Sequence, residues 1–347
     1  MTLYKRPCSS LAYCLRSLIL PWESSVSDRD SLSTERVPQP QQGDSLAGYP
    51  DVAIVVDSAC CLSTDLLRRW HITQVPHELV IGDRSYRDGV DITTSDFYKI
   101  LREDRVVPTT TAPQPQEFLD GLQAASEFAG NILCITVASN FSVANRSAQA
   151  AMETAGDDLA HCRVKVVDSQ AAAGALGLIA LAAARWAAEG CDLDQVSGRV
   201  DRLIPRVNML AFLESFDYLN RSGRVSKIKA WTGSLLGVRP LIELQGGQAR
   251  LLERPRSRRR ATDRLVAITQ ERTSGMPVVV NIMEAGAAED ALVLERLIRD
   301  AMDCRELFIS QFTPVMGAHT GPGLLGAAFY TCDDQLSTME ADQVSEL

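Results

Sequence analysis

The sequence lacks a long hydrophobic run. Although 46% of its 347 residues are hydrophobic, no uninterrupted apolar stretch reaches the roughly 18 residues that a helix needs to cross a bilayer. Basic residues are also fewer than acidic ones. The sequence has 35 Lys and Arg residues and 44 Asp and Glu residues, which gives a net charge of -9. An acidic surface repels nucleic-acid phosphates. These two deficits exclude an integral membrane protein and argue against a nucleic-acid partner.

Paired cysteines are missing as well. The nine cysteines are spread irregularly, with no CxxC pair and no Cys/His cluster of metal-ligand spacing. Several lie in apolar runs, as Cys134 does, where a free thiol behaves as a small hydrophobic side chain. We therefore expect reduced thiols, a cytoplasmic protein and no metal site.

Motifs of common enzymes are absent or incomplete. The sequence has no GxSxG elbow and no P-loop. Residues 321–326 spell GxGxxG, but a proline inside them removes a backbone donor and no room for a dinucleotide-binding unit follows. Asp57, Ser58 and His319 are the residue types of a catalytic triad, yet an aspartate next to the serine would not ordinarily orient the histidine. We expect no catalytic residue and no cofactor, and keep an acyl or phosphoryl ester hydrolase using Ser58 or Ser139 as the alternative.

The length is sufficient for two domains. Residues 1–50 are expected to form a disordered N-terminal extension, because 23–50 are rich in Ser, Gln, Pro and Asp and poor in aliphatic side chains. An N-terminal α/β domain is expected at 51–207 and a C-terminal α/β domain at 208–330. Residues 331–347 then form a loose acidic tail.

Strand-like and helix-like segments alternate from residue 51 onward, which predicts an α/β fold whose first sheet is doubly wound and mostly parallel. The expected strands are 52–56, 72–81, 132–137, 164–167, 277–282, 306–312 and the segment ending at 330. The expected helices start near 94 and 116, end near 154 and 206, and cover 171–188, 216–219 and 289–302, with a hairpin turning at Gly246-Gly247. Prolines on both sides of Thr109, Thr110 and Thr111 predict that these threonines lie in a loop. Hydroxyl-bearing loops thus follow strand ends, where open α/β sheets bind ligands.

Four short motifs occur in an order and context typical of one family. They are Val-Val-Asp-Ser at 55–58, Tyr-Arg-Asp-Gly-Val-Asp-Ile at 86–92, Pro-Thr-Thr-Thr at 108–111 and Gly-Ala-His-Thr-Gly-Pro-Gly at 317–323. A serine loop at 139–142, a second Val-Val-Asp-Ser at 166–169 and an arginine-bearing loop at 221–224 add support. In these features, over about four-fifths of its length, the chain resembles the DegV family.

The resemblance implies a two-domain fold that holds one long-chain fatty acid between its domains without catalysis. It also implies a partner, an ATP-dependent fatty acid kinase subunit to which the bound acid is presented. The family's ligand-binding residues map onto Thr109, Thr110, Thr111, Ser139, Ser142 and His319. Loop-ordering roles beside them are expected for Asp57, Ser58, Gly321 and Gly323. Such a shell is reasonable, because a buried carboxylate is costly unless several donors meet it.

The chain departs from the usual family pattern in its binding loops. Residues 59–61 read Ala-Cys-Cys, Thr111 and Ala112 replace a serine and a glutamine, and 143–144 lack the usual glycine and threonine. We therefore expect the fold to follow the family more closely than the head-group contacts do. The hydroxyls also have a simpler interpretation, since threonines satisfy backbone groups in turns and Ser139 or Ser142 could cap the next helix.

Residues 254–260 are the densest positive segment. Arginine forks match phosphate and carboxylate groups, so we expect a docking surface for the kinase subunit or its ATP phosphates. Its residues would be Arg221, Arg224, Arg256, Arg258 and Arg259. A lipid sensor that contacts another protein through this surface is one alternative, and a solvated helix start is the other.

Overall fold

The structure, a computed structural model, describes residues 50–103, 107–224 and 237–332. All of them fall within one compact unit, Pro50–Leu347. Apart from residues 50, 331 and 332, the expected N-terminal extension and acidic tail lie outside the described residues. The boundary expected at 207 and 208 stays a prediction.

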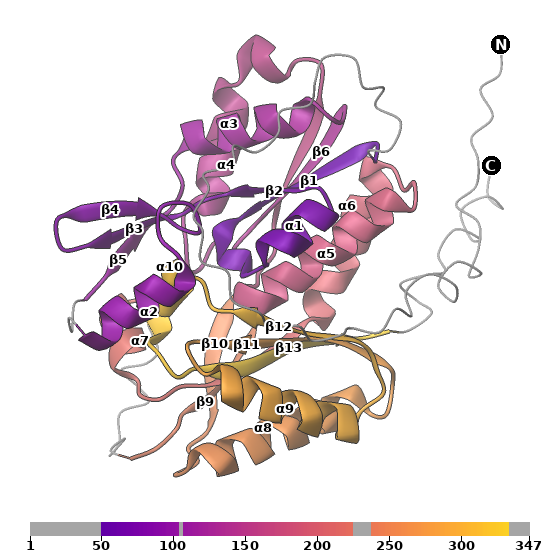
Figure 1. The fold of residues 1–347 in the computed structure, drawn as a ribbon. Helices are drawn as coiled ribbons and strands as arrows, with labels where there is room; N and C mark the ends of the chain where they lie inside the picture. The colour runs from indigo at the N-terminus through magenta and orange to yellow at the C-terminus, as the bar shows by residue number, and fades with distance from the viewer. Residues whose placement is uncertain (1–49, 104–106, 225–236, 333–347) are drawn as a thin grey trace, which may run out of the picture. The chain divides into compact units, whose positions relative to one another are not determined.

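Four parallel strands form the first sheet, in the order β2-β1-β6-β7. These strands are β1 (Val52–Asp57), β2 (Ile72–Val75), β6 (Asn131–Thr136) and β7 (Arg163–Asp168). The helices that pack on them are α1 (Thr64–Arg69), α3 (Pro115–Ser126), α4 (Ala144–Thr154), α5 (Ala173–Ala188) and α6 (Leu193–Leu203). Figure 1 shows α3 and α4 on one face and α5 and α6 on the other. Cover on both faces explains why β1 is buried along its whole length and apolar up to its last residue. The predicted doubly wound first sheet is confirmed.

Six strands form a mixed second sheet, in the order β10-β9-β8-β13-β11-β12. They are β8 (Asn208–Phe212), β9 (Leu241–Gln245), β10 (Gln248–Glu253), β11 (Val278–Glu284), β12 (Cys304–Gln311) and β13 (Leu325–Thr331). Helices α8 (Arg258–Thr273) and α9 (Ala288–Ala301) pack on this sheet (Figure 1). Helix α5 contacts β1 of the first sheet and β11 and β13 of the second. It is buried on nearly every side, and its sequence is accordingly apolar all round.

A third, antiparallel sheet has the order β4-β3-β5. Its strands are β3 (Glu78–Ile81), β4 (Arg84–Arg87) and β5 (Thr109–Thr111). The remaining helices are α2 (Thr94–Glu103), α7 (Asp217–Ser222) and α10 (Pro314–Thr320), with short 3-10 turns at Ser58–Cys60, Gly156–Leu159 and Ile204–Arg206.

Four sequence predictions about these elements are wrong. The strand expected at 72–81 is two strands in different sheets, separated at Pro76, which has no N–H to donate to a ladder. The threonines expected in a loop form β5, because β-branched residues pair readily with a neighbouring strand. His319, expected among loop glycines, lies in the last turn of α10, and Arg221 likewise lies in α7.

Candidate functional site

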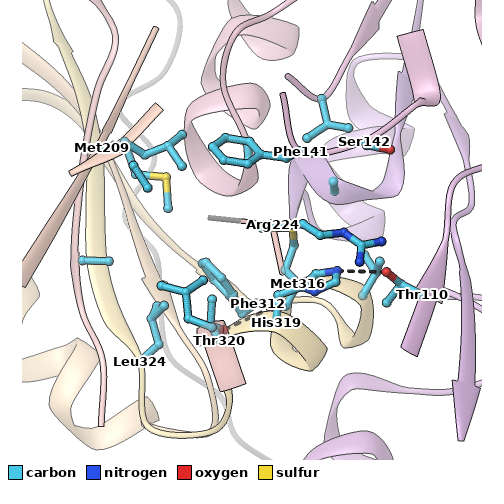
Figure 2. Close-up of a pocket in the computed structure, with 18 of the residues that line it drawn as sticks. Thr110, Phe141, Ser142, Met209, Arg224, Phe312, Met316, His319, Thr320 and Leu324 are labelled. Carbon is cyan, nitrogen blue, oxygen red and sulfur yellow. Dashed lines mark hydrogen bonds between the residues drawn. The ribbon is translucent and has the colours of Figure 1, made fainter. Parts of the chain in front are cut away.

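A pocket lies between the carboxyl ends of the first sheet's strands, the second sheet and α10 (Figure 2). Its space, including the open mouth, is about 910 Å³. That volume lies in the range of about 300–1,000 Å³ that is usual for small-molecule sites.

One wall of the pocket is a face of the second sheet. Met209 and Ala211 of β8 line it, and they pair across the ladder with Leu244 and Ile242 of β9, which also line it. Alternate residues of a strand point to opposite faces, so Leu210 of β8 lies instead in the core beneath α8 and α9. The wall is therefore continuous and apolar.

The opposite end of the pocket is polar. Thr110 Oγ1 of β5 lies 2.9 Å from Nε2 of His319, which α10 supplies. Figure 2 shows the Arg224 guanidinium beside this pair. Burial, with a smaller contribution from the charge of Arg224, lowers the pKa of His319 to about 4. A neutral imidazole, a hydroxyl and the permanently charged guanidinium of Arg224 together favour the binding of an anionic group.

The three threonines do not act together. Thr110 lines the pocket, whereas Thr111 Oγ1 donates to Glu78 Oε2 at 2.9 Å on the other face of the small sheet. Thr109 is exposed and also lies outside the pocket lining. Strand alternation explains the division, because neighbouring residues of β5 point to opposite faces.

The two serines also separate. Ser142 lines the pocket and accepts the N–H of Ala144 at 3.2 Å. The exposed Ser139 donates its hydroxyl proton to Asp168 Oδ2 at 2.5 Å, and its N–H bonds the same carboxylate. Of the six expected ligand-binding residues, the structure brings together Thr110, Ser142 and His319.

Asp57 and Ser58 lie buried behind the pocket. Asp57 accepts the N–H of Ala59 at 3.1 Å and of Val137 at 2.6 Å, which ties the ends of β1 and β6 together. Ser58 donates to Asp88 Oδ2 at 2.7 Å. Burial raises the pKa of Asp57 to about 7 and that of Asp88 to about 6.

Gly321 and Gly323 shape the turn after α10. Gly321 has a φ of +76°, and a Cβ there would overlap the Tyr218 ring. Gly323 donates its N–H to Ala285 O at 2.7 Å and accepts from Arg258 Nη1 at 2.8 Å.

The five expected docking arginines fall into three groups. Arg224 lines the pocket, which the sequence interpretation missed. Arg258 is held within the fold by Gly323 and by Asp290, whose Oδ2 lies 2.7 Å from its Nε, and Arg221 stacks on the Tyr218 ring at 4.8 Å. Arg256 and Arg259 are exposed.

Other pocket residues were not expected from the sequence. Phe141, between the two serines, lines the pocket, as do Met316 one helical turn before Thr320 and the buried His77. The sequence feature that could have pointed to His77 is Pro76. This proline follows the end of β2, and the chain then passes through His77 into a strand of a different sheet.

The family model described as an uncharacterised protein of the DegV family matches residues 51–331. The chain belongs to the DegV family. A DegV domain-containing protein of Streptomyces coelicolor is 34% identical over 277 residues, covering 79% of this chain and 96% of the relative. The resemblance seen in the motifs is thus confirmed.

Solved DegV structures share the fold. A DegV family protein from Thermus thermophilus, described for its fatty acid binding, has a TM-score of 0.75 at 26% identity, covering 81% of this chain and 100% of that one. A DegV lipid-binding protein from Thermotoga maritima has a TM-score of 0.74 at 25% identity, covering 82% and 99%. The α/β fold of DegV type is confirmed.

Over 50–103, 107–224 and 237–332, no group of three or more His, Cys, Asp or Glu side chains is placed to hold a metal ion. Within the same ranges, no helix is both long and apolar enough to cross a membrane.

Proposed function

We propose that this protein binds one long-chain fatty acid and does not act on it chemically. The observation that carries this proposal is a single pocket with an apolar wall from β8 and β9 and a polar end formed by Thr110, His319 and Arg224. The fatty-acid- and lipid-binding relatives described above support it.

The two ends of the ligand have different roles. The carboxylate pairs with Arg224 and accepts the Thr110 hydroxyl proton, while Nε2 of His319 donates to the Thr110 oxygen and holds this hydroxyl in place. Each buried methylene contributes about 0.8 kcal/mol, so a chain of about 16 carbons contributes roughly 11 kcal/mol before the cost of association. The acyl chain therefore supplies most of the affinity.

A serine-dependent hydrolase is the alternative, and the hydroxyl partners argue against it. The protons of Ser58 and Ser139 are donated to Asp88 and Asp168, and Nε2 of His319 faces Thr110. In a catalytic triad the serine donates its proton to a histidine that a carboxylate orients, whereas both serines here donate to carboxylates.

Native mass spectrometry of the purified protein, followed by extraction under denaturing conditions, tests the proposal directly. One fatty acid per chain, or uptake of one added hexadecanoic acid, is the expected result. A protein that is empty and takes up no fatty acid would contradict it, and release of free acid from an acyl ester would favour the hydrolase.

We further propose that the bound acid is presented to a separate ATP-dependent kinase subunit in the cytoplasm. Of the expected docking residues, Arg256 and Arg259 are exposed and suit such a contact, while Arg258 supports the fold. Replacing Arg256 and Arg259 with Glu should slow acyl phosphate formation by added kinase subunit and ATP without weakening fatty acid binding. An unchanged rate would show that Arg256 and Arg259 do not form the docking surface for the kinase subunit. Contact of this surface with a protein other than a kinase would favour the lipid sensor.

A further inference from the structure

His77 lies at the polar end of the pocket, and the proposed function does not use it. Its side chain lines the pocket and the residue is only 4% exposed. In the pairing of β3 with β5, Leu79 faces Thr110. His77 precedes Leu79 by two residues, so its side chain lies on the same face of the small sheet as Leu79. This position is diagonally opposite Thr110.

The Nδ1 atom of His77 faces away from the ligand space. It lies 3.5 Å from Ser58 Oγ and 3.8 Å from Asp57 Oδ1. Burial, with a smaller contribution from His319, lowers the pKa of His77 to about 3, so the ring is neutral and carries one proton.

The neighbours of Nδ1 decide where that proton is. The Ser58 hydroxyl donates its proton to Asp88 at 2.7 Å and accepts a hydrogen bond from the backbone N–H of His77 at 3.0 Å. Toward Nδ1 the Ser58 oxygen can act only as an acceptor, and an oxygen of Asp57 also favours a proton there. The proton therefore sits on Nδ1, and Nε2 is a bare acceptor.

This bare acceptor needs a donor. Among the described residues, the only hydrogen bond of the His77 side chain is at Nδ1, while its backbone N–H and C=O bond Ser58 and Asp88. Once a ligand fills the pocket and excludes water, an acceptor without a partner is costly, so a ligand that supplies a donor gains affinity. A carboxylate cannot supply one, and Arg224 keeps the ligand carboxyl ionised.

We propose that Nε2 of His77 accepts a hydrogen bond from a hydroxyl group near the carboxyl end of the ligand. The pocket would then select a hydroxylated long-chain fatty acid over the unsubstituted acid. This inference rests on the proposed function, because it assumes that the carboxylate binds at Thr110, His319 and Arg224.

Displacement titrations at pH 7.5 with a fluorescent acyl probe test it. The ligands are hexadecanoic acid and its 2-hydroxy and 3-hydroxy derivatives. The wild type should bind at least one hydroxy acid about tenfold more tightly than hexadecanoic acid, because one buried hydrogen bond is gained. His77→Leu should lose this preference, so that it binds the three acids with affinities equal to within about twofold. His161→Leu, which changes an exposed histidine, should retain the preference.

Each other result overturns the inference. Equal binding of all three acids by the wild type would overturn the inference. This result needs no variant, so it does not depend on whether His77→Leu folds. A preference that survives His77→Leu would place its origin elsewhere, and an equal loss for all three acids would make His77 a residue of the fold or of the carboxylate site. If the protein binds hexadecanoic acid without a preference for a hydroxyl group, only the inference fails and the proposed function stands. If it binds none of the acids, both the inference and the proposed function fail.

Discussion

The Thr110 hydroxyl and the His319 imidazole lie 2.9 Å apart although 209 positions separate them in the sequence. Helix α10 makes this contact possible because elements of the first half of the chain hold it. Its Val315 N–H donates to Asp88 Oδ1 at 3.3 Å, and Tyr98 of α2 donates to Phe312 O, just before the helix, at 3.1 Å. The polar end of the pocket is thus assembled from both halves of the chain.

Thr110→Val should weaken the binding of hexadecanoic acid about tenfold, because it removes a hydroxyl donor to an anion while keeping the shape of the side chain. Thr111→Val is the matched control, since Thr111 bonds Glu78 outside the pocket. Isothermal titration calorimetry measures both. Equal losses in the two variants would mean that the small sheet, and not one hydroxyl, determines affinity.

Arg224→Gln should weaken hexadecanoic acid binding by roughly tenfold or more and leave hexadecanol binding nearly unchanged, since only the acid carries a charge. It should also raise the pKa of His319, because the charge of Arg224 is one cause of its lowered pKa. NMR titration of the imidazole resonances measures that shift. Arg221→Gln is the control, because Arg221 stacks on Tyr218 outside the pocket. A similar effect of both variants would favour a general surface charge over a pocket residue.

Asn140→Ala should speed the release of bound fatty acid several-fold. The side chain of Asn140 donates to Gly247 O at 3.0 Å, and Gly247 N donates to Gln170 O at 2.7 Å, so the turn between β9 and β10 is fastened to the first sheet. Asn140 precedes the pocket residue Phe141, and β10 carries the pocket residue Ala249.

Stopped-flow displacement of a fluorescent fatty acid measures this release rate. Asn131→Ala is the control, because it removes a similar bond, from Nδ2 to Asp51 O at 3.3 Å, at the far end of β6. An unchanged rate in Asn140→Ala would show that the acid leaves by another route.

His77 should make the wild type lose stability in acid. Its pKa is lowered from 6.5 to about 3, so between these values the unfolded chain holds a proton that the folded protein does not. The free energy of unfolding therefore falls as the pH drops below about 6.5, and this contribution is constant above that value. The raised pKa values of Asp57 and Asp88 act in the opposite direction, but in the wild type and in His77→Leu alike.

Urea unfolding at pH 7.5, 6 and 5 compares the two proteins. The free energy of unfolding of the wild type, minus that of His77→Leu, should decrease as the pH falls. A difference that does not vary with pH would mean that the imidazole takes up its proton as readily in the folded protein as in the unfolded chain.

Gly321→Ala should destabilise the protein by about 1–3 kcal/mol more than Gly275→Ala, a range typical of overpacking. Both glycines have a φ of +76°, but a Cβ at Gly321 overlaps the Tyr218 ring and one at Gly275 meets open space. Thermal unfolding monitored by circular dichroism measures the two losses. Equal losses would mean that backbone strain alone, and not the ring contact, makes glycine necessary after α10.

The candidate site was only partly predictable. The sequence pointed to Thr110, Ser142 and His319, but it could not separate them from Thr109, Thr111 and Ser139. That separation depends on the pairing of β5 with β3, which sets the face of each threonine, and on Asp168, which takes the proton of Ser139. Arg224 was expected on a docking surface because its place in the loop at 221–224 carries no information about the direction of its side chain.

By itself, the sequence determined the alternation of strands and helices, the doubly wound first sheet and membership of the DegV family. These follow from periodicity and short motifs, which are properties of neighbouring residues. Only the tertiary structure decided which hydroxyls face the pocket, where Arg224 points and that His77 lies beside the ligand space. Those outcomes depend on the packing of segments far apart in the chain, and local propensity has no means of encoding them.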